Sequence, residues 1–458
     1  MMKARFNPLY VLIGIFFFWG FVAASNTVLI AAFKQNFSLT QFQSQLVDSA
    51  FYAAYFLGSL AYFLQGRKGN DASQKYGYKR LLTFGLTLSA IGAFGFIPAS
   101  YLSSFPLMLA SLFVVGLGFS IQQIVVNPLL LNLGSDENGA RRINLAGGIN
   151  SLGTTIGPLL VSFVLFGSIS SGNNSLKMDD LPIPYTILGF AFLIVAFIVQ
   201  LSRMPVIAKK EISETVNSFK VDANALWGML AIFCYVGVEV ALQSNLPAYV
   251  KSDNVLGLSE ANSVHYISLY WGCLMIGRLC ASIEVFKLPK ALIVPGRFII
   301  SAVVYAIIMG VNWLKGSPMI DFLYFAPFVL IFPIIISITS NLPRKSMLAL
   351  CGLGVLCCIL AVTMPGNVGL FAILIGGLCC SILWPCIFAL ALRDKKGEQA
   401  MLSSLLIMMI LGGAFLPPLQ GYIADISNIT IGYTVPMIGF VVLILFAFRN
   451  KEITAVTK

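Results

Sequence analysis

Long apolar blocks recur along the whole chain, and they constrain its fold more than any other feature of the sequence. A helix needs about 20 apolar residues to cross the hydrocarbon core of a bilayer, and blocks of that length follow one another from Leu9 to Arg449. Because lipid cannot hydrogen-bond to peptide groups, segments this long are expected to be helical. The strands of a membrane barrel would be about half as long and would alternate in polarity. Hydrophobic residues make up 58% of the chain and charged residues only 10%, which excludes a soluble enzyme, a secreted disulfide scaffold and a disordered tail.

The apolar blocks predict an all-α, polytopic membrane protein with fourteen spans. The expected spans cover approximately residues 9–33, 46–66, 81–100, 105–132, 143–168, 183–202, 225–250, 262–284, 291–314, 320–341, 346–364, 367–392, 399–423 and 430–449. The first block lacks a small-residue cleavage site and many others follow it, so we interpret it as a retained span and not as a signal peptide.

The basic residues predict how these spans are oriented. When the 29 Lys and Arg residues are assigned to alternating sides, 24 fall on one side and 4 on the other, and Arg297 falls inside a span. Cytoplasmic loops carry an excess of Lys and Arg, so both termini are expected on the cytoplasmic side of the cell (inner) membrane. The net charge of +11 is therefore interpreted as orienting the chain against anionic lipid, and no nucleic-acid partner is expected.

A basic polar linker divides the spans into two sets. Residues 203–224 form the longest polar stretch between apolar blocks, and they separate the six spans of residues 1–202 from the spans of residues 225–458. This is the layout of two-bundle secondary transporters, which bind substrate near the membrane midplane, between bundles that rock about it.

Glu239 is the ionisable residue that lies deepest in an expected span. Such a residue costs about 2.5–3.5 kcal/mol on insertion scales and therefore indicates function. Glu239 lies in the middle of FCYVGVEVALQSNLPAYV and is expected to face a wet cavity, where it is protonated, ion-paired or bound to a cation. Asp48, Glu284 and Arg297 lie closer to span ends, and for these three we favour snorkelling to the interface.

Several spans carry polar side chains on one helix face. Gln123 and Asn127 are four residues apart, as are Glu239 and Gln243, so each pair shares a face. Asn and Gln both donate and accept hydrogen bonds, which suits the hydroxyls of a sugar, and aromatic rings offer flat apolar faces to a pyranose. Hydrogen bonds between helices explain any single amide equally well, but the recurrence of amides on several helices favours a polar central cavity. Further residues of these kinds are Trp19, Asn26, Asn144, Asn150, Tyr235, Trp384 and Gln420.

Motifs in most spans resemble the fucose–galactose–glucose symporter family of the major facilitator superfamily. They are NFSLTQFQSQLVDSAFYAAYFLGSL (36–60), GLGFSIQQIVVNPLLLNLG (116–134), RINLAGGINSLGTTIGP (142–158), FCYVGVEVALQSNLPAYV (233–250), IGRLCAS (276–282), ILWPCIFALAL (382–392) and ILGGAFLPPLQGYIAD (410–425). The forms GVEV and GGAFLPPLQGYIAD look closest to the glucose/galactose branch. The resemblance implies a major facilitator fold with two six-helix bundles and cation-coupled uptake of a monosaccharide.

Two positions depart from the pattern of that family, and a third follows only one of its branches. Its first helix typically reads Asn-Asp where this chain has Asn26-Thr27, so the carboxylate that resembles the proton carrier of the fucose symporters is missing. Gln123 stands where the fucose branch has Glu, as in the glucose/galactose branch. Gly147 stands where the family has a Gln that contacts the sugar.

Two other segments are interpreted through the same resemblance. Residues 285–343 hold two expected spans that the family core does not need, and we interpret them as a peripheral hairpin inserted into the second bundle. The cytoplasmic loop 67–80 resembles the superfamily's loop between helices two and three, with IGRLCAS as its counterpart. Lys79, Arg80 and Arg278 are therefore expected to latch the bundles in one state, although a charge run that anchors the chain to the membrane explains them equally well.

Together these inferences predict a secondary active transporter that imports a hexose or a related monosaccharide by alternating access. Glu239 is expected to couple transport to H⁺ or Na⁺. The expected sugar-binding residues are Asn26, Gln123, Asn127, Asn150, Gln243, Asn245, Trp384 and Gln420.

Two other transport modes stay open, namely a cation-independent sugar facilitator and a fourteen-span drug/proton antiporter. An enzyme is not expected, because a single His and one deep carboxylate form no catalytic constellation and no nucleotide-binding loop occurs. The single His also argues against a His-based metal site, and the nine Cys lie in apolar blocks without the spacing of a disulfide framework. We expect a monomer in the lipid bilayer, with no cofactor apart from the coupling ion, H⁺ or Na⁺.

Overall fold

The structure is a computed structural model, and every regular element that it describes is helical. It describes residues 7–36, 41–67, 71–134, 138–166, 182–204, 221–253, 255–257, 264–286, 288–314, 316–339, 342–393 and 398–451, with side chains described outside residues 23–49 and 158–181. The chain forms two compact units. Unit 1 comprises Met1–Leu133, Leu152–Val221 and Asp394–Met408, and unit 2 comprises Gly134–Ser151, Asp222–Arg393 and Met409–Lys458.

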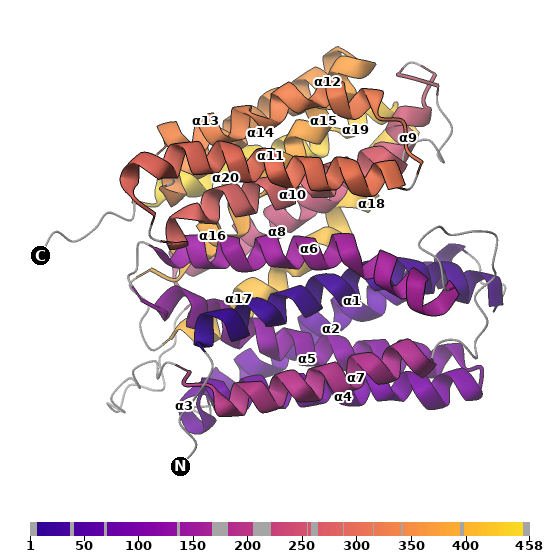
Figure 1. Ribbon diagram of the computed structural model, residues 1–458, viewed down its shortest axis with the longest axis vertical. Helices are drawn as coiled ribbons and strands as arrows, with labels where there is room; N and C mark the ends of the chain where they lie inside the picture. Colours follow the sequence, from indigo (N-terminus) through magenta and orange to yellow (C-terminus); the bar gives the residue numbers. More distant parts are fainter. Residues whose placement is uncertain are drawn as a thin grey trace, which may run out of the picture. The chain divides into compact units, whose positions relative to one another are not determined.

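Unit 1 is built around α4 and α5. Helix α4 packs against both α5 and α7, and α2 and α17 pack against α5; α4, α5 and α7 run side by side in Figure 1. Ser104 begins α5, and its hydroxyl accepts a hydrogen bond from the Leu107 amide, which satisfies one of the free N–H groups at the helix start. The helices are α1 (Pro8–Asn36), α2 (Gln41–Arg67), α3 (Ala72–Tyr76), α4 (Tyr78–Tyr101), α5 (Phe105–Asn132), α7 (Pro182–Leu201) and α17 (Gln399–Met408).

Unit 2 is built around α8, α10 and α14. Helix α8 packs against α18 and α20, α10 against α11 and α15, and α14 against α15 and α20. Asp222 begins α8 and accepts a hydrogen bond from the Ala225 amide. The elements are α8 (Ala223–Ser244), α9 (Leu246–Lys251), α10 (Val264–Ser282), η5 (Ile283–Phe286), α11 (Lys290–Leu314), α12 (Ile320–Val329), α13 (Ile331–Ile338), α14 (Pro343–Thr363), α15 (Asn367–Cys380), α16 (Leu383–Ala391), η6 (Met409–Leu411), α18 (Gly412–Ile426), α19 (Ile429–Gly432) and α20 (Thr434–Arg449).

Helix α6 (Gly139–Phe166) contributes to both units. Its residues as far as Ser151 belong to unit 2, and those from Leu152 onward belong to unit 1. The predicted division into residues 1–202, a linker at 203–224 and residues 225–458 differs from this partition, and it stays a prediction.

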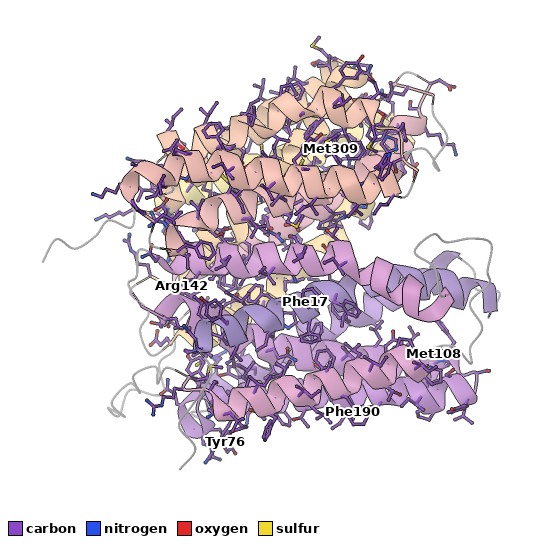
Figure 2. All side chains as sticks on the ribbon, viewed as in Figure 1. Phe17, Tyr76, Met108, Arg142, Phe190 and Met309 are labelled. Atoms are coloured by element: carbon purple, nitrogen blue, oxygen red, sulfur yellow. The ribbon has the colours of Figure 1, made fainter. Side chains whose placement is uncertain are left out.

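Some helices present large apolar side chains to their surroundings. On α7 these recur every three or four residues and so share one face, and Phe190, labelled in Figure 2, is one of them. The full set on α7 is Ile183, Ile187, Phe190, Leu193, Ile194 and Phe197. Only 28% of the apolar window of α11 is buried, compared with 83% for the segment α15–α16. Helices α7 and α11 therefore suit contact with lipid, whereas α15 and α16 form part of the core of unit 2.

The prediction of fourteen spans is wrong for the described chain, in which eleven helices are long and apolar enough to cross a membrane. The expected spans 9–33, 46–66 and 143–168 are not among the eleven. The apolar part of α1 with described side chains is only Pro8–Val22, α2 begins with QFQSQLVDS, and α6 begins with Gly-Ala-Arg-Arg. Within the described residues, these three segments therefore do not meet the length and hydropathy of a span. The peripheral hairpin predicted at residues 285–343 depended on the count of fourteen spans and is not retained. Its two segments correspond to α11 and to α12–α13, which are two of the eleven candidate spans.

Cysteines are confined to unit 2. All nine, from Cys234 to Cys386, are buried thiols.

Helices α8 and α18 approach each other unusually closely because glycine lies at their contact. A Cβ atom on Gly412 would overlap the carbonyl oxygen of Phe233, and one on Gly237 would lie 2.6 Å from Cδ2 of Leu416. Helix α18 starts at Gly412, directly after the 3₁₀ turn η6. The glycine therefore lets a broken helix seat its first turn against the backbone of α8.

Replacing Gly412 by Val is expected to destabilise the protein by about 3 kcal/mol, the upper end of the range for overpacking, because the obstacle is backbone that cannot rotate away. Thermal unfolding in detergent and the yield of monodisperse protein would measure this. The matched control is Gly421→Ala on the same helix, where an added Cβ meets nothing within 4 Å. Equal losses of stability in the two variants would contradict the close approach.

Candidate functional site

A buried carboxylate lies near the middle of one span, at Glu239 of α8. The side chain is 13% exposed. The hydroxyl of Tyr235, one helical turn earlier, donates to Oε2 of Glu239, and Nη2 of Arg278 lies 3.6 Å from Oε1. The hydroxyl of Tyr270 donates to the main-chain oxygen of Glu239 over 2.8 Å. Both carboxylate oxygens thus have a partner, so the structure shows the ion-paired member of the three alternatives expected for Glu239.

Arg278 of α10 supplies the positive charge of this pair. Its side chain is 12% exposed. Nε donates to the carbonyl of Ser381 over 3.1 Å, and Nη1 donates to Oγ of Ser151 over 3.0 Å and to the carbonyl of Gly147 over 3.5 Å. A Cβ atom at residue 147 would lie 3.2 Å from Cδ of Arg278, so the glycine makes room for the arginine stem.

The latch role predicted for Arg278 stays a prediction. The sequence assigned it to a cytoplasmic latch, but in the structure its guanidinium lies inside a span and contacts α8, the first part of α6 and the end of α15. The sequence had no local signal for the pair, because Glu239 and Arg278 lie on different helices.

In unit 1, the amides of α5 form a second polar group. Nε2 of Gln123 donates to the hydroxyl of Tyr55 over 2.8 Å, and Nδ2 of Asn127 donates to the carbonyl of Gln123 over 2.9 Å. Oε1 of Gln123 and Oδ1 of Asn127 are buried without a hydrogen-bond partner among the described residues. Two acceptors on one helix face therefore lack a donor within the described part of the chain, and water or a ligand hydroxyl could supply one.

The neighbouring Gln122 was not among the predicted site residues, and both polar atoms of its side chain form hydrogen bonds. Its Oε1 accepts from the indole of Trp19 and its Nε2 donates to Ser89, each over 2.9 Å. Its side chain is completely buried. Gln122 therefore stabilises the packing of α1, α4 and α5, which is the interhelical role that any single amide can play. The 100° rotation between adjacent helix residues separates it from Gln123.

The other predicted sugar-binding residues lie mainly in unit 2. Gln420 is completely buried, and neither side-chain atom of its amide has a hydrogen-bond partner among the described residues. The ring of Trp384 stacks on Phe388 at 4.8 Å and lies 6.1 Å from that of Tyr235, which places Trp384 beside the Glu239 pair.

The remaining members of the predicted sugar site are less closely associated. Asn245 lies at the junction of α8 and α9 and donates to Ser244 over 3.4 Å, and Gln243 and Asn150 are partly buried. Asn26, also predicted to bind the sugar, is one of the residues whose side chains the structure does not describe. Because Gln123 and Asn127 belong to unit 1 and the others with described side chains to unit 2, a common sugar pocket stays a prediction.

The predicted latch residues of loop 67–80 lie near the start of α4. Nζ of Lys79 donates to the carbonyls of Gln200 and Ser202 over 2.5 and 3.0 Å, and Arg80 is exposed. A lysine at these carbonyls stabilises the C-terminal end of α7. Its latch role stays a prediction.

A second buried ion cluster surrounds Glu284 in η5. Oε2 of Glu284 lies 2.5 Å from Nη2 of Arg141, and Oε1 accepts from Arg297. Arg297 also donates to Ser337 over 3.0 Å and is only 3% exposed. The expectation that Glu284 and Arg297 snorkel separately is wrong, because they pair with each other and join the start of α6 to α11 and α13.

Helices with apolar outer faces and a charged pair deep in one span define a multi-pass membrane protein. Comparison with known sequences identifies the family within this class of protein. The Major Facilitator Superfamily profile matches residues 11–346. The chain belongs to this superfamily.

Curated relatives align over nearly the whole chain. A "Glucose/galactose transporter" of Brucella abortus (strain 9-941) is 28% identical over 444 residues, covering 96% of this chain and 92% of that one. A "Putative glucose/galactose transporter" of Helicobacter pylori (strain ATCC 700392 / 26695) is 29% identical over 453 residues, covering 96% of each. An "L-fucose-proton symporter" of Escherichia coli (strain K12) is 26% identical over 473 residues, covering 98% of this chain and 94% of that one. The predicted resemblance to the fucose–galactose–glucose symporters is confirmed.

A solved structure shares the fold. The crystal structure of a Major Facilitator Superfamily transporter, FucP, in the outward conformation matches with a TM-score of 0.75 and 24% identity, and the match covers 98% of this chain and 100% of that chain. This likeness gives no support to a hairpin additional to the shared fold.

Proposed function

We propose that this protein is a secondary active transporter that imports a monosaccharide, a hexose or a close relative, together with H⁺ or Na⁺. The observation that carries the proposal is the alignment over almost the entire length with two groups of relatives, both named as sugar transporters. Buried amide acceptors on Gln123, Asn127 and Gln420 have no hydrogen-bond donor among the described residues, and this supports a ligand rich in hydroxyl donors.

In this proposal Glu239 carries the coupling function. It is a carboxylate deep in a span, and such groups serve in substrate and proton pathways. Gln123, Asn127, Asn150, Gln243, Asn245, Gln420 and Asn26 would bind the sugar, and Trp384 would provide the stacking face. The transporter would act as a monomer, perform no chemistry on its substrate, and have both termini in the cytoplasm, as the uneven distribution of Lys and Arg favours.

A cation-independent sugar facilitator is the second candidate. Thr27 stands where the resemblance expects a carboxylate, so one coupling group of related proteins is missing. Accumulation above the external concentration separates the two candidates, because a facilitator only equilibrates its substrate. A fourteen-span antiporter is not retained, because the span count on which it rested is wrong.

A thermal-shift panel on purified protein tests the sugar class. At a concentration of about 100 Kd, a ligand that binds only the folded state stabilises it by about 2.7 kcal/mol. We expect at least one monosaccharide to raise Tm among hexoses, deoxyhexoses and N-acetylhexosamines tested with and without Na⁺ and across pH. Sorbitol at the same concentration controls for the general effect of polyols. No shift beyond the sorbitol value for any sugar would contradict the proposal.

A further inference from the structure

We infer that unit 2 binds an anionic phospholipid at the end where helix α20 finishes and helices α8 and α14 begin. The headgroup phosphate would bind between Arg449 and Lys345, and one acyl chain would lie along α14 over Ala349 and Gly352. This inference concerns lipid and is independent of which solute the protein transports. It is carried by exposed cations that lie at the ends of exposed apolar helix faces.

Polar and aromatic contacts bring three helix ends of unit 2 together. Helix α20 packs against both α14 and α8. Nε of Arg344, in the first turn of α14, donates to the carbonyl of Ala447 in the last turn of α20 over 3.1 Å. The guanidinium carbon of Arg449 lies 5.9 Å from the ring centroid of Trp227, near the start of α8. The start of α14, the end of α20 and the start of α8 therefore lie beside one another.

This end of unit 2 carries an excess of positive charge. The side chains of Lys345, Arg449 and Lys451 are exposed. Arg393 lies at the same place, because its Nη1 donates to the carbonyl of Lys451 over 3.0 Å. More basic than acidic residues occur in each of the segments PRK (343–345), RDKK (393–396) and RNKE (449–452). Clustered Lys and Arg at the end of a span attract anionic lipid headgroups.

The exposed cations continue into apolar helix faces. On α14, exposed residues recur every three or four positions from Lys345 onward and so share one face. This face consists of Lys345, Ala349, Gly352, Leu356 and Ile359. On α20, an exposed apolar face likewise precedes Arg449, and it consists of Ile438, Val441, Leu445 and Phe448. Each helix therefore presents a long apolar face with a cation at one end, which matches the long apolar body and charged end of a phospholipid.

Small residues leave room for an acyl chain directly beyond the cations. Ala349 and Gly352 are exposed on α14, and a Cβ atom on Gly352 would meet nothing within 4 Å. At 1.5 Å per residue, Gly352 lies about 10 Å along the helix from Lys345. Trp227 beside Arg449 is typical of the membrane–water interface, where tryptophan is enriched. The shallow part of the α14 face therefore begins just below the depth expected for a headgroup.

A phospholipid fits this surface better than a second copy of the chain does. Two copies in one membrane share the same orientation, so a symmetric dimer through α14 and α20 would bring Lys345 and Arg449 near the same cations of the other copy. Like charges repel. A phospholipid instead brings a phosphate, which arginine binds through paired hydrogen bonds, and hydrocarbon for the apolar faces.

Native mass spectrometry of the purified protein in detergent tests the headgroup site. Phosphatidylglycerol and phosphatidylcholine with identical acyl chains are titrated, and the Kd of the first bound lipid is measured. We expect a Kd on the order of tenfold lower for phosphatidylglycerol, because two cations face its charge. Arg449→Gln and Lys345→Gln should each raise that Kd about fivefold and leave the Kd for phosphatidylcholine unchanged.

Lys290→Gln is the matched control for the charge. It also removes an exposed cation of unit 2 at the start of a span, but α11 packs against α10, α12 and α13. Both Kd values should equal those of the wild type. Equal affinity of the wild type for the two lipids, or equal effects of Arg449→Gln and Lys290→Gln, overturns the inference.

Gly352→Leu separates a lipid site from a site for a soluble anion. The leucine fills the shallow face while every cation remains, so the Kd for both lipids should rise several-fold. Gly310→Leu on α11 is the control, since a Cβ atom there also meets nothing within 4 Å, and it should change neither Kd. Glycerol 3-phosphate should not displace phosphatidylglycerol. Displacement by glycerol 3-phosphate together with unchanged lipid binding in Gly352→Leu would assign the cations to a soluble anion and overturn the lipid site. If Arg449→Gln does not accumulate in membranes, the lipid preference of the wild type and the Gly352→Leu result still decide.

Discussion

Replacing Glu239 by Gln is expected to reduce the accumulation of sugar to equality across the membrane, while exchange of labelled for unlabelled sugar continues. Glutamine has nearly the same shape and can still accept a hydrogen bond from Tyr235, so the change removes little besides the ionisable group. Without that group, the inward gradient of the coupling ion cannot drive transport, whereas exchange needs only substrate binding and alternating access. Concentrative uptake and counterflow in proteoliposomes measure the two processes separately.

The control for this prediction is Asp425→Asn on α18. It removes one carboxylate as well, but from an exposed position, and should leave accumulation unchanged. Accumulation that persists in Glu239→Gln would show that Glu239 is not the coupling residue.

Replacing Glu284 by Gln is expected to lower the free energy of unfolding by about 3–5 kcal/mol, because removing one member of a buried ion cluster leaves the other charges uncompensated. Here two guanidinium groups, those of Arg141 and Arg297, would lose their shared carboxylate. Thermal unfolding in detergent measures the loss.

Asp321→Asn serves as the comparison. Oδ2 of Asp321 accepts from Tyr266 over 2.9 Å and lies 3.2 Å from Nε2 of His265, and the side chain is 26% exposed. Asparagine can keep a hydrogen bond at this oxygen. Its loss should be about 1 kcal/mol or less. If both substitutions cost the same, Glu284 does not act as the centre of an ion cluster.

Much of the helical framework could be predicted from the sequence, because the length of an apolar block is a local property fixed by the bilayer. The block at 105–132 coincides with α5, and the block at 291–314 begins one residue after α11 does. The breaks inside spans were not predicted. The interruptions at Ser381–Ile382 and at Met409–Leu411 fall within uniformly apolar stretches, where hydropathy carries no signal.

The candidate site could be predicted only in part. Glu239 was recognisable because an isolated carboxylate in a span is conspicuous, and Gln420 because amides recur on several spans. Its pairing with Arg278 depends on how α8 and α10 pack, which no spacing along one helix encodes. The same holds for Gln122 and Gln123, identical neighbours in sequence. Both polar side-chain atoms of Gln122 form hydrogen bonds, whereas Oε1 of Gln123 has no partner among the described residues.

The confinement of buried cysteines to unit 2 has a practical consequence for following conformational motion. Buried thiols in apolar surroundings react slowly with maleimide dyes, so the native residues would contribute little background labelling. A cysteine introduced at an exposed site of unit 1, such as Tyr76, could therefore carry a fluorophore in the otherwise unaltered chain, without first constructing a cysteine-free variant.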